Sequence, residues 1–214
     1  MRKRQFLIDL PHMIYRRLYS AIAARRGNLS GIPINFSWIT PNLAVGGRFP
    51  VEAAEHFATK LGVTHIVDVR VEDKDDEAVL KEHGITLLHL PTVDTRAISQ
   101  DMLEDGVAWI NQQLADGGRV YIHCAHGIGR SVLLACCVLV SMGYSAQDAL
   151  RLVKQKRRQA APNQEQLNAL VEFARRWRSQ FGGFTGDTLA DLKAIAYSDR
   201  ATIGLKLQIA ACRL

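Results

Sequence analysis

The sequence predicts an α/β domain with a central, mostly parallel sheet of four to five strands flanked by helices. Short, β-branched apolar segments alternate with longer segments whose apolar residues recur every three or four positions, the order expected of strand–helix–strand units. The 214 residues suffice for one domain with a sizeable core. The composition, 48% hydrophobic and 22% charged, is that of a globular protein rather than a disordered or fibrous one.

Five segments carry the strand signal of short apolar runs bounded by turn residues. They are residues 34–39, 43–47, 64–69, 85–90 and 119–123. Pro41-Asn42 predicts a turn between the first two segments, and Pro91 is expected to end the fourth.

Six segments carry a helical stripe of apolar residues. They are residues 50–61, 75–83, 99–114, 129–142, 145–156 and 163–181. Ser99 and Ser145 are typical N-capping residues, and Pro50 suits a first helical turn. The uncharged run of residues 131–147 is short for a membrane span and is predicted to be a buried helix.

A further helix is predicted near the N-terminus, where apolar side chains form a single stripe. They are Leu7, Leu10, Ile14, Leu18 and Ile22. We therefore expect a basic amphipathic helix and linker over residues 1–33, the α/β domain over residues 34–180, and a C-terminal extension over residues 181–214. No function follows from the sequence of this extension.

The positive charge is concentrated at the N-terminus. Residues 1–26 hold seven basic residues and one acid, so this segment has a net charge of +6, the same as the whole chain. The body of the protein is therefore not a basic nucleic-acid binder, and no nucleic-acid partner is expected. A basic amphipathic helix can lie on an anionic membrane or pack on the domain with its arginines outward, and both arrangements stay open for residues 1–26.

The four cysteines fit a reducing compartment. Cys136 and Cys137 are adjacent within an apolar run, and no spacing suits zinc or a disulfide framework. The N-terminus lacks the uninterrupted apolar region of a secretory signal. We therefore expect a cytoplasmic protein, either free or peripheral at a membrane.

The stretch HCAHGIGRS, residues 123–131, lies where the last predicted strand meets the most apolar predicted helix. Such a loop points backbone N–H groups into one concavity, and the helix dipole adds partial positive charge. Gly127 and Gly129 are expected to supply positive φ angles and close backbone approach. Arg130 can bind two phosphate oxygens at once, and the same field would ionise Cys124. The stretch therefore predicts a site for a tetrahedral dianion above a thiolate.

This stretch resembles the HCxxGxxR[ST] signature of the cysteine-dependent protein tyrosine and dual-specificity phosphatases. The matching residues are His123, Cys124, Gly127, Arg130 and Ser131. The resemblance extends over about residues 34–180 and includes PNLAVGG (41–47) and APNQEQL (161–167). It implies a compact dual-specificity phosphatase fold and an enzyme that hydrolyses phosphate monoesters with no metal and no other cofactor.

By this resemblance, Cys124 is the nucleophile that becomes phosphocysteine, and Arg130 binds phosphate and stabilises the transition state. Ser131 assists departure of the thiolate, and His123 helps to keep the pKa of Cys124 low. The phosphate is expected to contact the loop, which consists of Ala125, His126, Gly127, Ile128, Gly129 and Arg130. The side chain of His126 is expected to point outward, where a substrate would pass.

Two other families place a cysteine in an anion-binding loop. Rhodanese-type sulfurtransferases usually have four residues between Cys and Arg, whereas five separate Cys124 from Arg130. The small phosphatases with a similar loop carry it near the N-terminus, whereas Cys124 lies in the middle of the chain. Both families are therefore disfavoured.

Cleavage of a phosphate monoester also needs a proton for the leaving oxygen. The resemblance places this acid on the loop after the strand that precedes the cysteine strand. Asp94 lies there, and it is the only acidic residue between Glu82 and Asp101. Asp94 is therefore the predicted acid, and Asp101, at a position typical of helix-stabilising acids, is the alternative.

Other polar residues receive less specific predictions. The acid-rich residues 68–76 lack an EF-hand pattern and are expected to form a solvated loop, in which Asp68 and Arg70 border the pocket. Structural roles are expected for His65, His83 and His89.

Three functions stay open for this site. The first is a phosphatase acting on phosphorylated protein. The second acts on a phospholipid at a membrane, because LHLPTVDT also resembles the mitochondrial phosphatidylglycerophosphate phosphatase; Ala125 and Ile128, in place of loop lysines, disfavour a polyphosphorylated inositol. The third is a non-catalytic phosphate-binding module, which would need neither Cys124 nor Asp94.

Overall fold

The computed structural model describes residues 34–180 and 186–198. Its sheet has the order β1-β2-β5-β3-β4. The strands are β1 (Phe36–Trp38), β2 (Leu43–Gly47), β3 (His65–Arg70), β4 (Thr86–Thr92) and β5 (Val120–Cys124). β1 is antiparallel to β2, and the other neighbours are parallel. The predicted, mostly parallel sheet is confirmed.

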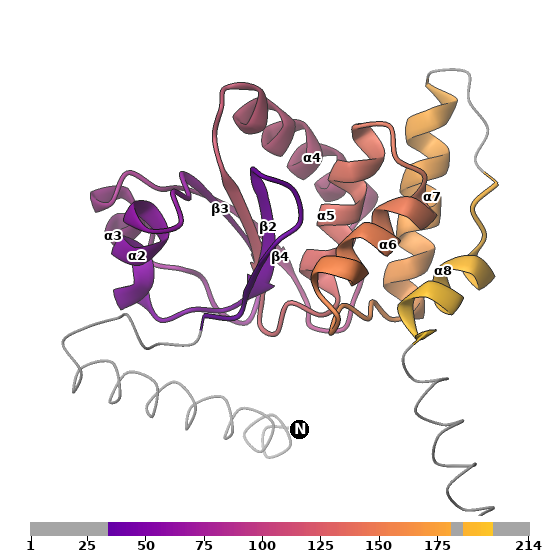
Figure 1. The fold of residues 1–214 in the computed structure, drawn as a ribbon, viewed down its shortest axis with the longest axis horizontal. Coiled ribbons are helices and arrows are strands. Elements are labelled where there is room, and N and C mark those ends of the chain that lie inside the picture. Colours follow the sequence, from indigo (N-terminus) through magenta and orange to yellow (C-terminus); the bar gives the residue numbers. More distant parts are fainter. Residues whose placement is uncertain (1–33, 181–185, 199–214) are drawn as a thin grey trace, which may run out of the picture.

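Helices cover both faces of this sheet (Figure 1). They are the 3₁₀ helix η2 (Val51–Ala53), α2 (Ala54–Thr59), α3 (Glu77–Glu82), α4 (Gln100–Ala115), α5 (Arg130–Ser141), α6 (Ala146–Lys156), α7 (Gln164–Ser179) and α8 (Leu189–Ala196). Two apolar clusters fill the two sides of the sheet. The smaller includes Phe57 of α2 and Leu80 of α3, and the larger includes most of α5.

The central elements are β5 and α5, which flank the loop singled out above. Every residue of β5 is buried, as are residues 130–140 of α5. The uncharged run is thus a core helix, as predicted. No helix of the described residues is long and apolar enough to cross a membrane. Because strand, loop and helix are all packed in the core, the loop between them is held at both ends.

The strand β4 extends further than predicted. Pro91 was expected to end it, yet the strand continues to Thr92. β4 is an edge strand, where a proline without an N–H can face solvent without breaking a ladder. The register against β3 shifts between Asp68 and Arg70, so that Arg70 pairs with Thr92.

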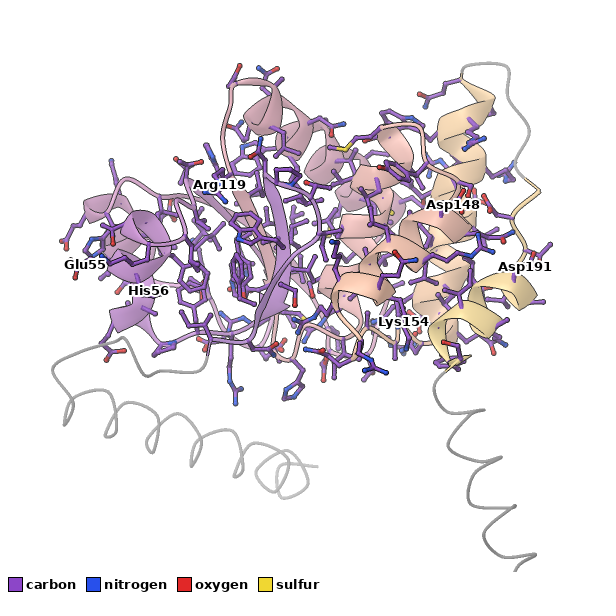
Figure 2. The ribbon with its side chains drawn as sticks, viewed as in Figure 1. Glu55, His56, Arg119, Asp148, Lys154 and Asp191 are labelled. Atoms are coloured by element: carbon purple, nitrogen blue, oxygen red, sulfur yellow. The ribbon has the colours of Figure 1, made fainter. Side chains whose placement is uncertain are left out.

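The described part of the C-terminal extension packs on the domain. α8 lies against α6 and α7 (Figure 1). Lys154 of α6, labelled in Figure 2, donates its Nζ to the carbonyl oxygens of Ala196 (2.8 Å) and Ala160 (3.1 Å). The hydroxyl of Tyr197 donates to the oxygen of Pro162 (2.8 Å). α8 therefore supports the segment between α6 and α7. The helix predicted over residues 7–26 lies outside the described residues.

Candidate active site

The loop of residues 124–130 begins at the carboxyl end of β5 and ends in the first turn of α5. Arg119, labelled in Figure 2, immediately precedes β5 and so lies at the opposite end of this strand. The sulfur of Cys124 accepts hydrogen bonds from the N–H of Gly127 (3.1 Å) and from the Ser131 hydroxyl (3.4 Å). The side chain of His126 is exposed, as predicted. The loop thus folds back over its own cysteine.

These bonds favour the thiolate form of Cys124. Burial by itself opposes ionisation, but the hydroxyl and backbone N–H of Ser131, the charge of Arg130 and the N–H of Gly127 together outweigh it. The pKa of Cys124 is consequently lowered from its ordinary value. Burial has the opposite result at Cys136 and Cys137, where it raises the pKa of both thiols. Among these three cysteines, only Cys124 has the electrostatic environment of a nucleophile.

Backbone donors hold two carbonyl groups of the loop outward. The N–H of Arg48 donates to the oxygen of Ala125 (3.2 Å), and that of Ala161 donates to the oxygen of Ile128 (3.0 Å). In a trans peptide, the C=O group and the next N–H point in opposite directions. These two bonds therefore turn the N–H groups of His126 and Gly129 toward the inside of the loop, where an anion would bind.

A buried arginine from outside the loop holds the other two carbonyl groups. Arg157, just after α6, donates to the oxygens of Gly127 (2.6 Å) and His126 (3.1 Å). The amide of Asn35 also donates to His126 (3.0 Å). Neither Arg157 nor Asn35 was identified from the sequence, because neither has a local motif.

The two glycines of the loop are required for different reasons. Gly127 has φ +69°, and a Cβ there would also collide with the Arg157 guanidinium and the Gly46 backbone. Gly129 was predicted to have a positive φ as well, but its φ is −121°. A Cβ at Gly129 would instead collide with the side chain of Gln166. Close approach, rather than backbone conformation, therefore explains Gly129.

Arg130 is buried and makes contacts along most of its guanidinium. Its Nη1 and Nη2 donate to the two carboxylate oxygens of Glu72 (2.8 and 2.7 Å), and Nη1 also donates to the oxygen of Thr92 (2.7 Å). Asp94 lies 2.8 Å from Nη2. The buried Nε has no hydrogen-bond partner among the described residues. Glu72 thus fixes one edge of the guanidinium and leaves Nε as a donor for a ligand.

The loop that carries Asp94 is anchored to the first turn of α7. Asn163 donates to the carbonyl oxygen of Thr95 (2.5 Å), and Glu165 accepts from the N–H of Ala97 (3.1 Å) and from Arg96 (3.0 Å). Thr95 has φ +65°, a conformation that β-branched residues rarely adopt. Anchored, strained backbone of this kind is common where a side chain must be held in place.

The structure brings Asp94 to Arg130 at the predicted site, whereas Asp101 lies on the surface of α4. Asp94 contacts Arg130, although its side chain is 61% exposed. Asp101 is exposed and lies in the first turn of α4. The geometry therefore favours Asp94 as the acid at this site.

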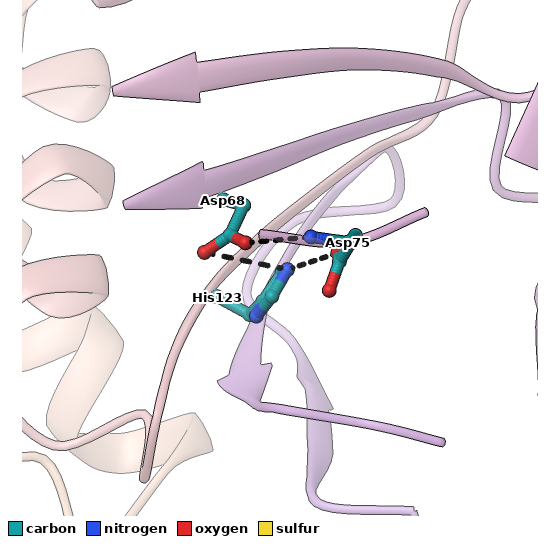
Figure 3. A group of neighbouring side chains, drawn as sticks. All are labelled: Asp68, Asp75 and His123. Atoms are coloured by element: carbon teal, nitrogen blue, oxygen red, sulfur yellow. Dashed lines mark hydrogen bonds and ion pairs between the residues drawn. The ribbon is translucent and has the colours of Figure 1, made fainter. Parts of the chain in front are cut away.

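The expectation that residues 68–76 form a solvated loop is wrong for three carboxylates. Glu72 binds Arg130, as described above. A carboxylate oxygen of Asp75 lies 2.7 Å from Nε2 of His123 and forms an ion pair with the protonated ring. Asp68 is fully buried and has a carboxylate oxygen 4.0 Å from the same nitrogen (Figure 3). These residues fold back because Arg70, with a side chain only 3% exposed, binds Asp68 (2.8 Å) and Asp75 (2.7 Å). Asp68 and Arg70 are thus buried beside His123, and whether they border the pocket stays a prediction.

This cluster also has the spacing of a metal site, since Asp68, Asp75 and His123 offer ligand atoms within 4.8 Å of one another. Both carboxylates already share the buried guanidinium of Arg70. A buried ion-pair network therefore accounts for the cluster. Burial opposes a charged His123 ring, but Asp75 and then Asp68 outweigh it and raise the pKa of His123 above its ordinary value.

Replacing Asp75 by asparagine should make stability depend less on pH. Asp75 has a lowered pKa, so its stabilisation is complete above the ordinary value of 3.8 and is lost as the pH falls through its folded value. His123 has a raised pKa, so its stabilisation is complete below 6.5 and is lost as the pH rises through its folded value. Thermal unfolding should show that Asp75→Asn destabilises most between pH 3.8 and 6.5, by about 1.5–3 kcal/mol.

Asp105→Asn is the matched control for this measurement, because it removes an exposed carboxylate from α4. Its unfolding should follow that of the wild type at every pH. The network would be of no energetic importance if Asp75→Asn behaved in the same way.

Comparison with known proteins agrees with this geometry. The family model described as dual specificity phosphatase, catalytic domain, matches residues 49–176, which is more than half of the chain. The protein tyrosine phosphatase type IVA 3 of Homo sapiens is 32% identical over 124 residues, which cover 57% of this chain and 70% of that protein. Type IVA 2 of Mus musculus is 30% identical over 129 residues, covering 59% and 76%.

Solved structures support the same fold. Tk-PTP in its active form matches with a TM-score of 0.62 and 28% identity, covering 66% of this chain and 97% of that one. PTPMT1 in complex with PI(5)P matches with a TM-score of 0.65 and 21% identity, covering 69% and 99%.

The α/β fold, the HCAHGIGRS loop at the end of the central strand and these similarities converge on one family. The chain belongs to the dual specificity phosphatase family of the cysteine-dependent protein tyrosine phosphatase superfamily.

Proposed function

We propose that the chain hydrolyses phosphate monoesters of phosphorylated proteins through a phosphocysteine intermediate. The observation that carries this proposal is the buried Cys124 sulfur, which accepts two hydrogen bonds within a loop whose N–H groups face inward. Nε of Arg130, a donor without a hydrogen-bond partner among residues 34–180 and 186–198, lies in the same site. Together they form a site for a phosphate with a nucleophile beneath it.

In the first step, the Cys124 thiolate attacks phosphorus and the bond to the ester oxygen breaks. Asp94 donates a proton to the leaving oxygen, so the departing group is a neutral alcohol or phenol. Because Asp94 lies at the guanidinium of Arg130, a phosphate held by Arg130 is within reach of its carboxyl group. Arg130 and the N–H groups of residues 126–129 stabilise the equatorial oxygens.

In the second step, the Asp94 carboxylate takes a proton from water, whose oxygen attacks phosphorus. The sulfur–phosphorus bond breaks, and the Ser131 hydroxyl, which donates to Cys124, stabilises the departing thiolate. Phosphate is released and Asp94 is protonated again. His123, fixed by Asp75 behind the loop, helps to hold Cys124 in position.

Phosphorylated protein is the favoured substrate class, because the relatives at 30–32% identity are named protein tyrosine phosphatases. The exposed His126 is placed to contact the residues that flank the phosphate.

A phospholipid is the second candidate, and an apolar rim around Arg130 favours it. Val71, 53% exposed, precedes Glu72; Val93, 58% exposed, lies between Thr92 and Asp94; and Ile128, 39% exposed, is in the loop itself. Exposed apolar side chains at a site mouth suit the uncharged part of a lipid. In this case residues 1–26 would contact the membrane, and the protein would be cytoplasmic and peripheral.

The experiment compares phosphate release by the full chain, with EDTA present, from three substrates: an aryl phosphate, a set of phosphopeptides, and phosphatidylglycerophosphate in vesicles. We expect the highest kcat/KM on phosphopeptides. A preference for vesicles that is lost in Val93→Ser would select the lipid instead. Met142→Ser is the matched control, because Met142 is also exposed but follows the far end of α5. Absence of release from all three would contradict both proposals.

A further inference from the structure

Arg157 is a buried charge to which no carboxylate of the described residues is hydrogen-bonded. Only 1% of the residue is exposed. Besides the two loop carbonyls, its guanidinium donates to Asn35 Oδ1 (2.6 Å), to Ser37 Oγ (3.3 Å) and to the oxygen of Val45 (3.4 Å). All of these acceptors are neutral. A buried cation among neutral acceptors is costly unless a nearby anion compensates it.

The anion at this position is Cys124. Burial lowers the pKa of Arg157, whereas the negative charges of Tyr121 and Cys124, when ionised, raise it. Burial keeps the pKa of Tyr121 well above its ordinary value, so this phenol stays neutral. The carboxylates near the loop are already paired with other cations, Asp75 with His123, and Glu72 and Asp94 with Arg130. The thiolate, and then the bound phosphate, is therefore the charge that Arg157 meets from behind the loop.

Arg157 also determines the direction of two peptide groups. Its bond to the oxygen of His126, shared with Asn35, turns the next N–H, that of Gly127, toward the sulfur of Cys124. Its bond to the oxygen of Gly127 turns the N–H of Ile128 inward in the same way. Without these bonds, the two peptide groups would be free to rotate, and the anion would lose two aimed donors.

We propose that Arg157, together with Asn35, is a positioning residue of the active site: it orients the Gly127 and Ile128 N–H groups and places a second fixed positive charge behind the loop. It does not touch the substrate. This role rests on the proposed function of Cys124 as nucleophile, so its test includes a readout that needs no turnover.

The experiment measures the pH dependence of Cys124 alkylation by iodoacetamide, together with kcat and KM on an aryl phosphate. In Arg157→Met, the alkylation midpoint should move to higher pH, because the thiolate loses both a charge and a hydrogen-bond donor. We expect kcat to fall about 10²-fold, as for loss of oriented oxyanion donors. Asn35→Ala removes one donor to the oxygen of His126 and one acceptor of Arg157. It should shift the alkylation midpoint and kcat in the same direction as Arg157→Met, but by less.

Arg158→Met is the matched control, since it removes the same charge from the adjacent, exposed position. Its alkylation midpoint should equal that of the wild type. Arg157→Lys separates the two roles: a single ammonium keeps the charge but cannot bind both carbonyls, so the midpoint should move less than in Arg157→Met while kcat falls at least tenfold.

The proposal is overturned if Arg157→Met, folded by circular dichroism, keeps the wild-type midpoint and kcat. If Arg157→Met does not fold, Arg157→Lys and Asn35→Ala decide, and wild-type kcat in both would overturn it. If Cys124 of the wild type is alkylated at low pH but no phosphate is released, the proposed function is contradicted. The effect of Arg157 on the alkylation midpoint can still be measured in that case.

Discussion

Cys124→Ser should abolish phosphate release, with a loss on the order of 10⁴-fold or more in kcat. A serine hydroxyl in this loop stays protonated at neutral pH, because the field that ionises a thiol is insufficient for an alcohol. The N–H groups and Arg130 are unchanged, so binding of phosphate should persist. Release would be measured with an aryl phosphate, and binding with inorganic phosphate by calorimetry.

Trapping of the intermediate makes this prediction more specific. Acid quenching of the wild type during turnover of a radiolabelled substrate should leave label on Cys124, and Cys124→Ser should carry none. Residual turnover near the wild-type rate would assign the nucleophile to another residue. Loss of both turnover and phosphate binding would instead indicate that the substitution had damaged the loop.

Asp94→Asn should lower kcat about 10²–10³-fold with little change in KM, as expected when a general acid is removed. An amide cannot supply the proton to the leaving oxygen. The loss of kcat should therefore be large for alkyl phosphates, whose alkoxide is a poor leaving group, and small for an activated aryl phosphate. Steady-state kinetics over a series of leaving groups measures this dependence.

Asp101→Asn is the control, because Asp101 is the other acid that the sequence offered and it lies exposed at the start of α4. Its kinetics should equal those of the wild type for every leaving group. The reverse result, a leaving-group-dependent loss in Asp101→Asn alone, would move the acid role from Asp94 to Asp101.

Local sequence was enough to predict the elements that carry the site. Strand periodicity and helical stripes located β5 and α5, because each buries its own apolar residues in the core. The loop between them follows from its cysteine, glycines and arginine. Asp94 was found because the family resemblance places the acid on the loop after this strand. Parallel strands also end on one side of the sheet, so that residues after β4 and β5 meet there.

Local reasoning failed where a residue's partner is distant in the chain. Residues 68–76 were predicted to be solvated because an acid-rich run normally is; two of its acids instead meet cations that other elements bring to them. Glu72 pairs with Arg130, 58 residues away. Asp75 pairs with His123, 48 residues away. A charge run contains no information on which cations the fold will place beside it.

The amino-acid sequence by itself therefore determined where strand, loop and helix meet at Cys124, because strand, turn and helix signals act over a few residues, and it supplied the candidate nucleophile and the candidate acid. Only the tertiary structure decided what holds that loop in shape. Asn35 and Arg157 are 122 residues apart, yet they meet on the loop's outward carbonyls. Orientation of a peptide group depends on the donors that surround it, and those donors are assembled only when the chain has folded.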